Sequence, residues 1–428
     1  MNVFVSGLWH LGSVISSCIS EHHDTTGFDP DQATVDNLSR GIPPIFEPGL
    51  EAEVQRGLAA GTLHFVHDLE VASNADVVWI AYDTPVDEQD RADVAYVDAQ
   101  AAALFPYLTD GTLVLVSSQM PVGSIARLER AFAASSERQV SFGYTPENLR
   151  LGQALSIFKH PDRIIVGVRT ASDREVVSNL FEGISNNIVW MSPESAEMTK
   201  HAINGFLAVS VTFMNEVAAI CERVGADSKD VEAGLRSESR IGPKAYVSPG
   251  TGFGGGTLAR DIQFLSEIGK TNGTAVDVLE GVLASNDKHK TWAERRLHDA
   301  LGELSGKEIA LLGLTYKPGT DTLRRSSAVE LAESLAALGA VVKAFDPAIH
   351  ELPVELRATI HLRASARAAL ASVDAVVVTT EWPEFKDLTA ADFTETMRTA
   401  IVLDPKRSLG EPLMTDDRIR YIAIGRGT

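Results

Sequence analysis

The chain has 428 residues, of which 44% are hydrophobic and 22% are charged, and these values are typical of a globular protein rather than a disordered or collagen-like one. The formal net charge of -20 disfavours nucleic acid or an anionic membrane as the main partner. With only two cysteines, a disulfide framework is excluded and a thiolate zinc site is disfavoured, so no metal site is expected. The N-terminal residues do not resemble a signal peptide and no apolar run is long enough to span a membrane. We therefore expect a soluble, cytoplasmic protein of about three domains.

The first half of the chain predicts strands that alternate with helices. A β-rich run at residues 2–6 ends at Gly7, helical spacing follows at 11–19, and a second strand at 25–28 ends at Asp29. Continuous apolar strands between helices are typical of a parallel sheet covered on both faces. The further elements predicted in this half are strands at 77–81, 113–117, 141–144 and 164–168, and a helix at 92–108.

The pattern changes near Pro193. Residues 194–225 predict one long helix, residues 237–256 form a loop rich in Gly, Pro and Ser, and residues 277–304 predict a second long helical stretch. Alternation then resumes, with strands at 308–312, 341–345, 373–379 and 400–403 and a helix at 328–338. We therefore expect an α/β fold in which two Rossmann-like, doubly wound domains are joined by a long-helix central domain, with boundaries at 1–192, 193–304 and 305–428.

The first turn has the sequence Gly7-Leu8-Trp9-His10-Leu11-Gly12. It follows a strand and precedes a helix, as does the G-x-G-x-x-G turn in which free helix amides hold a dinucleotide pyrophosphate. Trp9 replaces the middle glycine of that pattern. Asp29 ends the second strand, where a carboxylate accepts from a ribose 2′-hydroxyl and repels a 2′-phosphate, so NAD is expected rather than NADP. The alternative is an α/β fold with a tight turn and no dinucleotide.

Longer motifs follow in a fixed order along the chain. They include Ile42-Pro43-Pro44-Ile45-Phe46-Glu47-Pro48-Gly49, Pro146-Glu147-Asn148-Leu149-Arg150, Glu197-Met198-Thr199-Lys200 with Asn204, Arg240-Ile241-Gly242, Gly252-Phe253-Gly254-Gly255 with Asp261, and Gly313-Leu314-Thr315-Tyr316-Lys317-Pro318-Gly319 with Arg324. Through these motifs the chain resembles the UDP-glucose/GDP-mannose dehydrogenase family from end to end. The resemblance implies an NAD-binding domain, a helical dimerisation domain and a UDP-binding C-terminal domain. Members of the family oxidise the primary alcohol of a nucleotide sugar to a carboxylate in two hydride transfers, with two NAD.

The resemblance also implies a set of site residues. Lys200, Asn204 and Asp261 match catalytic residues of the family, Glu147 matches an active-site glutamate, and Thr257 takes the position of the catalytic cysteine. Cofactor binding is implied for Gly7, Leu8, Trp9, His10, Leu11, Gly12, Asp29, Thr84, Pro85, Ser118 and Arg324. Substrate binding is implied for Asn148, Leu149, Arg150, Arg240, Gly254 and Lys317, of which Arg240 would reach the substrate of a neighbouring subunit.

Three positions depart from the family pattern. Thr257 replaces the nucleophilic cysteine, Gln119 replaces a threonine that orders a catalytic water, and Leu151 replaces a second glutamate. A thiolate forms the thiohemiacetal that loses the second hydride, whereas a threonine hydroxyl is far less acidic. The expected reaction is therefore a single two-electron oxidation of a nucleotide sugar or a similar anionic alcohol. Full four-electron oxidation to a uronate, and a non-catalytic homologue that binds NAD or a nucleotide sugar, are the alternatives.

Several of these residues have simpler interpretations as well. Lys200 would ordinarily be a solvated charge on a helix, but it shares one face with Glu197 and Asn204, which suits a site. The other simple interpretations are Thr257 as an N-cap of a helix at 258–265, Asp261 as a solvated helix residue, and Arg240 and Lys317 as surface charges.

The long helix that begins near Glu194 also predicts an assembly. It is apolar on more than one face, with Phe206, Phe213 and Ile220 among its side chains. A helix of this kind needs burial on more than one side, so we expect a homodimer that acts on a small-molecule substrate.

Overall fold

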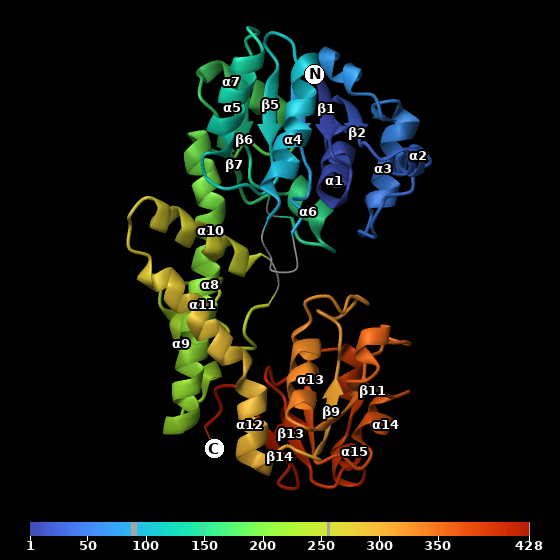
Figure 1. Ribbon diagram of the computed structural model, residues 1–428, viewed down its shortest axis with the longest axis vertical. Coiled ribbons are helices and arrows are strands. Elements are labelled where there is room, and N and C mark those ends of the chain that lie inside the picture. Colours follow the sequence, from blue (N-terminus) through green and yellow to red (C-terminus); the bar gives the residue numbers. More distant parts are fainter. Residues whose placement is uncertain (87–91, 148, 255–256, 428) are drawn as a thin grey trace. The chain divides into compact units, whose positions relative to one another are not determined.

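The computed structural model describes residues 1–86, 92–147, 149–254 and 257–427 (Figure 1). The predicted substrate-binding residue Asn148 and the glycines Gly255 and Gly256 lie outside the described residues. The chain divides into two compact units, Met1–Ile203 and Asn204–Thr428, and each is described by itself below. The three domain boundaries expected from the sequence stay a prediction.

The first unit contains an eight-stranded sheet with the order β3-β2-β1-β4-β5-β6-β7-β8. Neighbouring strands run parallel, apart from the antiparallel pair β6 and β7. The strands are β1 Asn2–Ser6, β2 Asp24–Phe28, β3 Leu63–Val66, β4 Val77–Ile80, β5 Leu113–Val116, β6 Ser141–Tyr144, β7 Ile164–Gly167 and β8 Ile188–Met191. The helices are α1 His10–Ile19, α2 Gln32–Ser39, α3 Leu50–Ala60, α4 Val94–Leu104, α5 Ser124–Ser135, α6 Ala154–Lys159 and α7 Ala171–Leu180, with 3-10 helices η1 Leu69–Asn74 and η2 Phe105–Tyr107.

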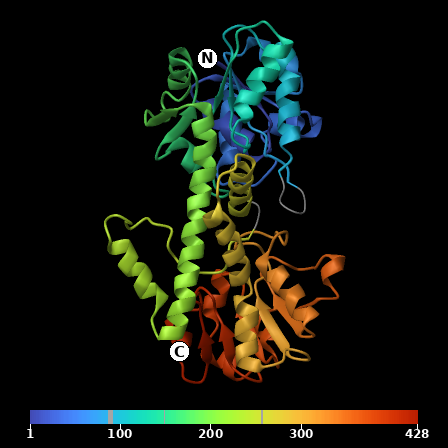
Figure 2. The ribbon, with the colours of Figure 1, turned by 60° about the vertical axis from the view of Figure 1, so that its left-hand side comes forward.

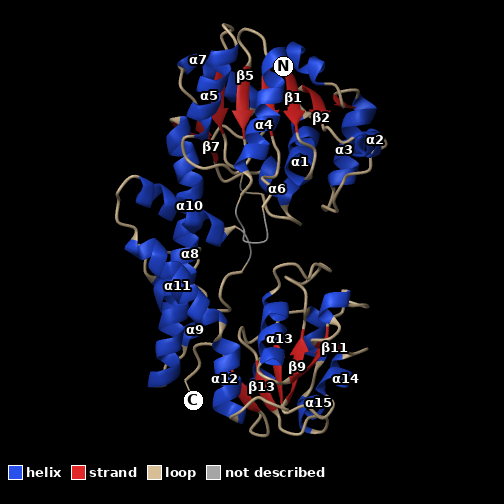
Figure 3. Cartoon of the chain, viewed as in Figure 1, coloured by secondary structure: helices blue, strands red, loops and turns tan. Residues whose placement is uncertain are grey.

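Helices cover both faces of this sheet (Figure 3). Val3 and Val5 of β1 pack with Leu11 and Ile15 of α1, whereas Phe4 between them packs into the opposite layer, with α4 and α5. Alternate residues of one strand therefore feed two cores, which explains why the strands are apolar throughout.

The second unit contains a six-stranded parallel sheet with the order β11-β10-β9-β12-β13-β14. This order repeats the pattern β3-β2-β1-β4-β5-β6 of the first unit. The strands are β9 Glu308–Leu312, β10 Val341–Phe345, β11 Ile360–Leu362, β12 Ala375–Val378, β13 Ile401–Leu403 and β14 Arg420–Ile422. The helices are α9 Ser228–Ser237, α10 Leu258–Thr271, α11 Asp277–Lys290, α12 Trp292–Leu301, α13 Ser327–Ala337, α14 Ala366–Leu370, α15 Ala390–Thr394 and α16 Glu411–Met414, with 3-10 helices η3 Val354–Leu356 and η4 Pro383–Asp387.

Helix α8, Pro193–Val224, has 32 residues and is uninterrupted (Figure 2). Three of its large apolar side chains, seven residues apart, are exposed: Phe206 at 69%, Phe213 at 52% and Ile220 at 60%. By length and composition alone this helix is long enough to cross a bilayer, but half of its most apolar window is buried within the protein. A buried core helix passes the same test, so the expectation of no membrane span stays a prediction.

Two predicted helices are shorter than expected. The stretch 277–304 is two helices, because Thr291 between them has φ -79 and ψ 6 and its hydroxyl donates to the carbonyl of Lys288 over 2.9 Å. The stretch 92–108 is helical from Val94 to Leu104 and then tightens to a 3-10 turn at Pro106, which has no amide hydrogen to continue the helix.

Four strands were not predicted from the sequence: β3, β8, β11 and β14. Each lies at an edge of its sheet, and each exposes part of its length to solvent. An edge strand therefore lacks the continuous apolar run that identified the central strands.

Candidate functional site

The turn after β1 is closed by two glycines at which a side chain would clash with neighbouring atoms. Gly7 has a φ of 97°, and a Cβ there would lie 2.8 Å from Cδ1 of Tyr82. A Cβ on Gly12 would lie 1.6 Å from the carbonyl oxygen of Gly7. Trp9, in place of the middle glycine, is 53% exposed, so its side chain does not enter this close contact. The turn therefore keeps the tight path that brings the N-terminus of α1 to the carboxyl edge of the sheet.

Asp29 lies beside this turn at the end of β2. Its carboxylate accepts from the backbone N–H of Leu8 over 2.9 Å and from that of Asp31 over 3.0 Å. A carboxylate has about four acceptor positions, and Asp29 is only partly buried. It can therefore still accept hydrogen bonds from the hydroxyls of a ribose.

A second turn in the chain has the same shape but a different carboxylate. Gly313 follows β9 with a φ of 98°, and Asp346 follows β10. Asp346 is 1% exposed and accepts from Leu314 N, Thr315 N, Thr315 Oγ1, Trp382 Nε1 and Ala348 N, over 2.7 to 3.1 Å. This carboxylate is saturated and covered, and α13 begins only at Ser327. The geometry favours the turn at Gly7, and not the one at Gly313, for a dinucleotide.

His10 ties the first turn to the loop before α6. Its Nε2 lies 3.0 Å from Oε2 of Glu47, and the buried Glu47 carboxylate also accepts from Gly152 N over 2.8 Å and Ala154 N over 2.9 Å. Glu47 thus joins three segments that lie far apart in the sequence. Sequence reasoning quoted the motif around Glu47 but did not predict this role.

The other residues expected to bind the cofactor fall in both units. Thr84 Oγ1 donates to the carbonyl of Gln119 over 2.7 Å, and the carbonyl of Pro85 accepts from Asp93 N over 2.8 Å. Ser118 is buried, and its hydroxyl has no hydrogen-bond partner within the described part of the chain. Arg324 belongs to the second unit, where it is exposed in a turn. The glycine turn, the exposed Trp9 side chain, Asp29 and the unpartnered Ser118 hydroxyl fit a bound dinucleotide.

Lys200 and Glu147 meet within the first unit. The Lys200 ammonium is buried and donates to the backbone carbonyl of Glu147 over 2.6 Å. The Glu147 carboxylate accepts from Leu149 N over 2.6 Å, whereas Arg150 is exposed. Glu147 and Leu149 also line a cavity of about 90 Å³, together with Leu11 of α1. Lys200 is therefore a fixed cation and not a solvated surface charge.

Asn204 and Asp261 meet within the second unit. Both are buried, and the Asn204 amide donates to the Asp261 carboxylate. Asp261 is therefore not a solvated helix residue. Thr257 precedes α10, but its backbone is already helical and its side chain makes no capping hydrogen bond. Thr257 thus occupies the N-cap position of α10, as one interpretation of the sequence expected, but its exposed side chain does not cap the helix.

The loop before Thr257 is held by three buried polar side chains that sequence reasoning missed. Asn286 clamps Phe253, accepting from its N–H and donating to its carbonyl, both over 2.9 Å. Asn215 accepts from Gly250 N over 2.9 Å, and His289 Nε2 lies 2.8 Å from the carbonyl of Gly250. Nothing in their spacing along α8 and α11 distinguishes them from ordinary helix residues, because their partners are backbone atoms distant in sequence.

The remaining predicted substrate residues of the second unit are less constrained. The side chain of Arg240 is 86% exposed, and its Nε donates to Glu238 over 2.9 Å. Lys317 is half-buried in the turn after Gly313. An ideal Cβ on Gly254 would lie 3.7 Å from the carbonyl oxygen of Arg325. Arg240 forms a surface ion pair within this chain, and its role toward the substrate of a neighbouring subunit stays a prediction.

Comparison with known proteins gives matches along nearly the whole chain. Residues 1–185 match the NAD binding domain of the UDP-glucose/GDP-mannose dehydrogenase family, residues 194–288 match its central domain, and residues 310–411 match its UDP binding domain. A UDP-glucose 6-dehydrogenase of Rhizobium meliloti is 35% identical over 436 residues, covering 100% of both chains. One from Bacillus subtilis is 31% identical and covers 99% of this chain and 93% of its own.

Solved structures agree with these matches. A UDP-glucose dehydrogenase from Pyrobaculum islandicum superposes with a TM-score of 0.86 at 30% identity, covering 100% of this chain and 98% of its own. A UDP-D-ManNAc dehydrogenase from Pyrococcus horikoshii, at 23% identity and a TM-score of 0.85, covers 100% of both chains and shows the same fold.

The clamp on Gly250 predicts a pH dependence of stability. Burial holds the pKa of His289 below its ordinary value of 6.5, against the opposing effect of its hydrogen bond to Gly250. As the pH falls through 6.5, His289 is therefore protonated in the unfolded chain before it is protonated in the folded chain. The free energy of unfolding decreases over this range, until the pH reaches the lower pKa of the folded state. We expect the thermal midpoint of wild type to fall more than that of His289→Gln between about pH 7.5 and about pH 5.5, a window that brackets the ordinary pKa of histidine. The glutamine keeps a donor for the Gly250 carbonyl but does not titrate. Equal falls in both proteins would contradict this.

Proposed function

We propose that this chain, which belongs to the UDP-glucose/GDP-mannose dehydrogenase family, oxidises the alcohol of a nucleotide sugar by two electrons only. As a member of that family it is an NAD-dependent dehydrogenase of CH–OH groups. The product would be the carbonyl compound, formed with one NADH and one proton. The observation that carries this proposal is Thr257, which stands where the resemblance to the family expects the nucleophilic cysteine.

No other thiol of the chain replaces that cysteine. Both cysteines, Cys18 in α1 and Cys221 in α8, are buried. Burial raises the pKa of the Cys18 thiol to about 12, which keeps it protonated and unreactive. Oxidation of an aldehyde to an acid through a thioester therefore lacks its nucleophile.

The residues that would serve the first oxidation are retained in this chain. When bound, NAD supplies the acceptor for the hydride. Lys200 holds an ammonium in a buried position, set by its bond to the Glu147 carbonyl, where it would stabilise a developing alkoxide. Asn204 and Asp261, bonded to each other, would assist in moving the proton of the alcohol.

The residues that would serve the second oxidation, and the hydrolysis that follows it, are replaced in this chain. By the resemblance, Gln119 stands where a threonine orders the catalytic water, and Leu151 stands where a second glutamate lies. Arg260, near Thr257, cannot act as a base, because a guanidinium stays protonated. A single loss can be compensated, but three losses at positions that serve one step favour a different reaction.

Two alternatives stay open to test. Full oxidation to a uronate would require Thr257 to act as the nucleophile with a dedicated base. A non-catalytic homologue that binds NAD or a nucleotide sugar would have no need of a buried, fixed Lys200. Release of NADH in the presence of candidate substrates distinguishes this last alternative from both enzymes.

The reaction stoichiometry tests the proposal. With purified enzyme and a panel of nucleotide sugars, we expect one NADH for each substrate consumed and a carbonyl product in the mass spectrum. Lys200→Ala should lower kcat by about 100-fold or more, because it removes the cation assigned to the alkoxide. The exposed Lys270, replaced by Ala, is the matched control and should leave kcat unchanged. Two NADH per substrate and a uronic acid would show that Thr257 has been misinterpreted, and Thr257→Cys alone should not produce the acid.

The cofactor preference tests the role proposed for Asp29. Asp29→Asn keeps an oxygen that accepts from Leu8 N but removes the negative charge, so the preference for NAD over NADP should narrow by about tenfold. Asp24→Asn, at the exposed start of the same strand, removes an equal charge and should leave the preference unchanged. Dissociation constants for both cofactors measure this. Wild type that binds NADP as tightly as NAD would refute the assignment of Asp29.

The exposed stripe on α8 supports the proposal of a homodimer. Phe206, Phe213 and Ile220 repeat every seven residues and would bury together against a second copy of the chain. We expect sedimentation at micromolar concentration to give the mass of a dimer and Phe213→Glu to shift it toward the monomer. Val354→Glu, which changes a still more exposed apolar residue on η3, serves as the control. A monomeric wild type would contradict the proposal.

The cytoplasmic location of the protein stays a prediction.

A further inference from the structure

One turn of helix α8 grips two loops of the first unit. Glu197, Lys200 and His201 lie at positions i, i+3 and i+4, and all three are buried. Each of the three hydrogen-bonds to backbone atoms of the first unit. The atoms belong to the loops that follow β5 and β6, and to the first turn of α5, at the carboxyl edge of the sheet, where doubly wound folds bind their ligands.

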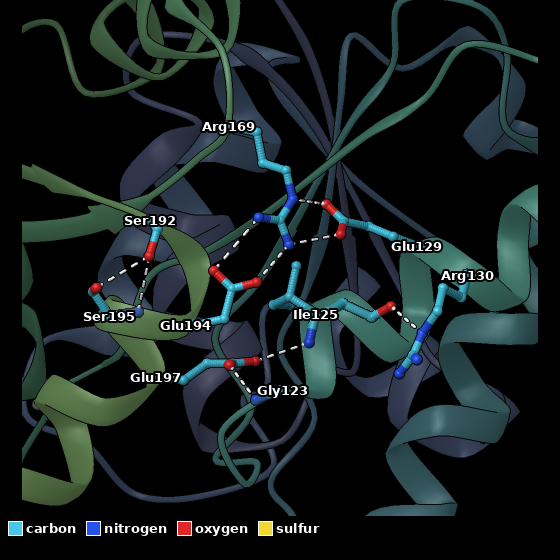
Figure 4. Close-up of polar contacts among 10 residues, drawn as sticks. Gly123, Ile125, Glu129, Arg130, Arg169, Ser192, Glu194, Ser195 and Glu197 are labelled. Carbon is cyan, nitrogen blue, oxygen red and sulfur yellow. Dashed lines mark hydrogen bonds and ion pairs between the residues drawn. The ribbon is translucent and has the colours of Figure 1, made fainter.

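Glu197 acts as a distant cap for α5 (Figure 4). Its carboxylate accepts from Gly123 N over 2.6 Å and from Ile125 N over 2.8 Å. Gly123, at the N-cap of α5, has no side chain to supply such an acceptor, and the first turn of α5 has no acidic residue. The carboxylate therefore satisfies two orphan amides and complements the positive end of the helix dipole. Because both of its oxygens are engaged, its orientation is fixed.

His201 holds the middle of the same loop. Its Nε2 lies 2.9 Å from the carbonyl oxygen of Met120. A carbonyl only accepts, so this nitrogen must carry the proton. Thr84 Oγ1 adds a third contact, donating to the carbonyl of Gln119 over 2.7 Å. The loop from Ser118 to Gly123 is thus held at three successive points.

This loop lies on the cofactor side of the sheet. It follows β5, which pairs with β4, and β4 pairs with β1, from which the glycine turn at Gly7 emerges. The loop carries Ser118, whose buried hydroxyl is unpartnered among the described residues. The same helical turn that holds the loop also carries Lys200, whose ammonium is fixed on the carbonyl of Glu147.

We propose that Glu197 and His201 are positioning residues, which hold the loop Ser118–Gly123 in register with Lys200 so that NAD meets both in one arrangement. They do not touch the reacting atoms themselves. That this loop meets NAD rests on the family assignment. That Lys200 acts in turnover rests on the proposed function.

An outer contact between the same two helices offers the matched control. The Arg169 guanidinium pairs with Glu129 of α5 over 2.6 and 2.7 Å and with Glu194 of α8 over 2.7 Å (Figure 4). It links α5 to α8 near the surface, and within the described part of the chain its hydrogen bonds go to these two carboxylates and not to the loop Ser118–Gly123. Glu129→Gln should therefore lower the thermal midpoint slightly and leave the affinity for NAD unchanged.

The test uses the full chain and measures NAD binding by calorimetry together with the thermal midpoint. Glu197→Gln keeps the size of the side chain but turns an amide NH₂ toward one of the two N–H donors, so the dissociation constant for NAD should rise by about tenfold. His201→Leu, which leaves the Met120 carbonyl unpaired, should have a similar effect. His201→Gln restores a donor and should bring the constant back to within about threefold of wild type.

The outcomes separate positioning from simple stability. Lower thermal midpoints in Glu197→Gln and His201→Leu, with NAD affinity unchanged as in Glu129→Gln, would overturn the proposal. If Glu197→Gln does not fold, the comparison of His201→Leu with His201→Gln decides alone. If wild type binds NAD but oxidises no nucleotide sugar, the proposed substrate class fails, and the binding data still decide the role of the two residues.

Discussion

The contact between Gly12 and the carbonyl of Gly7 is the constraint on which the cofactor end of the first unit depends. Any side chain at Gly12 would overlap that oxygen at 1.6 Å, so α1 can approach the sheet only with glycine at this point. The close approach sets the path of Leu8, whose N–H then reaches Asp29 at the end of β2. The position of His10, and through Glu47 that of the loop before α6, follows from the same turn.

Two turns of one shape need not bind the same ligand. Gly7 and Gly313 share a left-handed φ, and Ser13 and Ser326 donate to equivalent carbonyls, of Leu8 over 2.7 Å and of Leu314 over 2.6 Å. The difference lies in the carboxylates that follow. Asp29 is only partly buried and has acceptor capacity left, whereas the acceptor positions of Asp346 are filled within the protein, in part by the indole of Trp382. Backbone geometry thus gives both turns their shape, and the partners of the aspartate decide which turn keeps a carboxylate that can accept from the ribose hydroxyls of a dinucleotide.

This difference also marks what the sequence can predict. The central strands and the order of motifs gave the fold class and the family, because buried parallel strands leave an apolar signal that is continuous. The edge strands left no such signal. The hydrogen-bond partners of Asp346, Glu197 and His289 could not be predicted from the sequence. Each of these side chains bonds to a backbone atom that is distant along the chain. Glu197 illustrates this limit: its spacing with Lys200 placed it near a site, but the amides that its carboxylate accepts from, at the N-terminus of α5, could not be predicted.

The pattern of what is kept and what is replaced argues for a change of reaction rather than a loss of it. A buried ammonium is costly to hold, and the structure meets that cost for Lys200 with a short bond to the Glu147 carbonyl inside a unit braced by Glu197 and His201. In the proposed reaction this cation stabilises the developing alkoxide. The replaced positions, Thr257, Gln119 and Leu151, all belong by resemblance to the capture of an aldehyde and the release of an acid. Replacement at the positions that serve one step, beside retention of Lys200, Asn204 and Asp261, supports the proposal of an enzyme that stops after the first hydride.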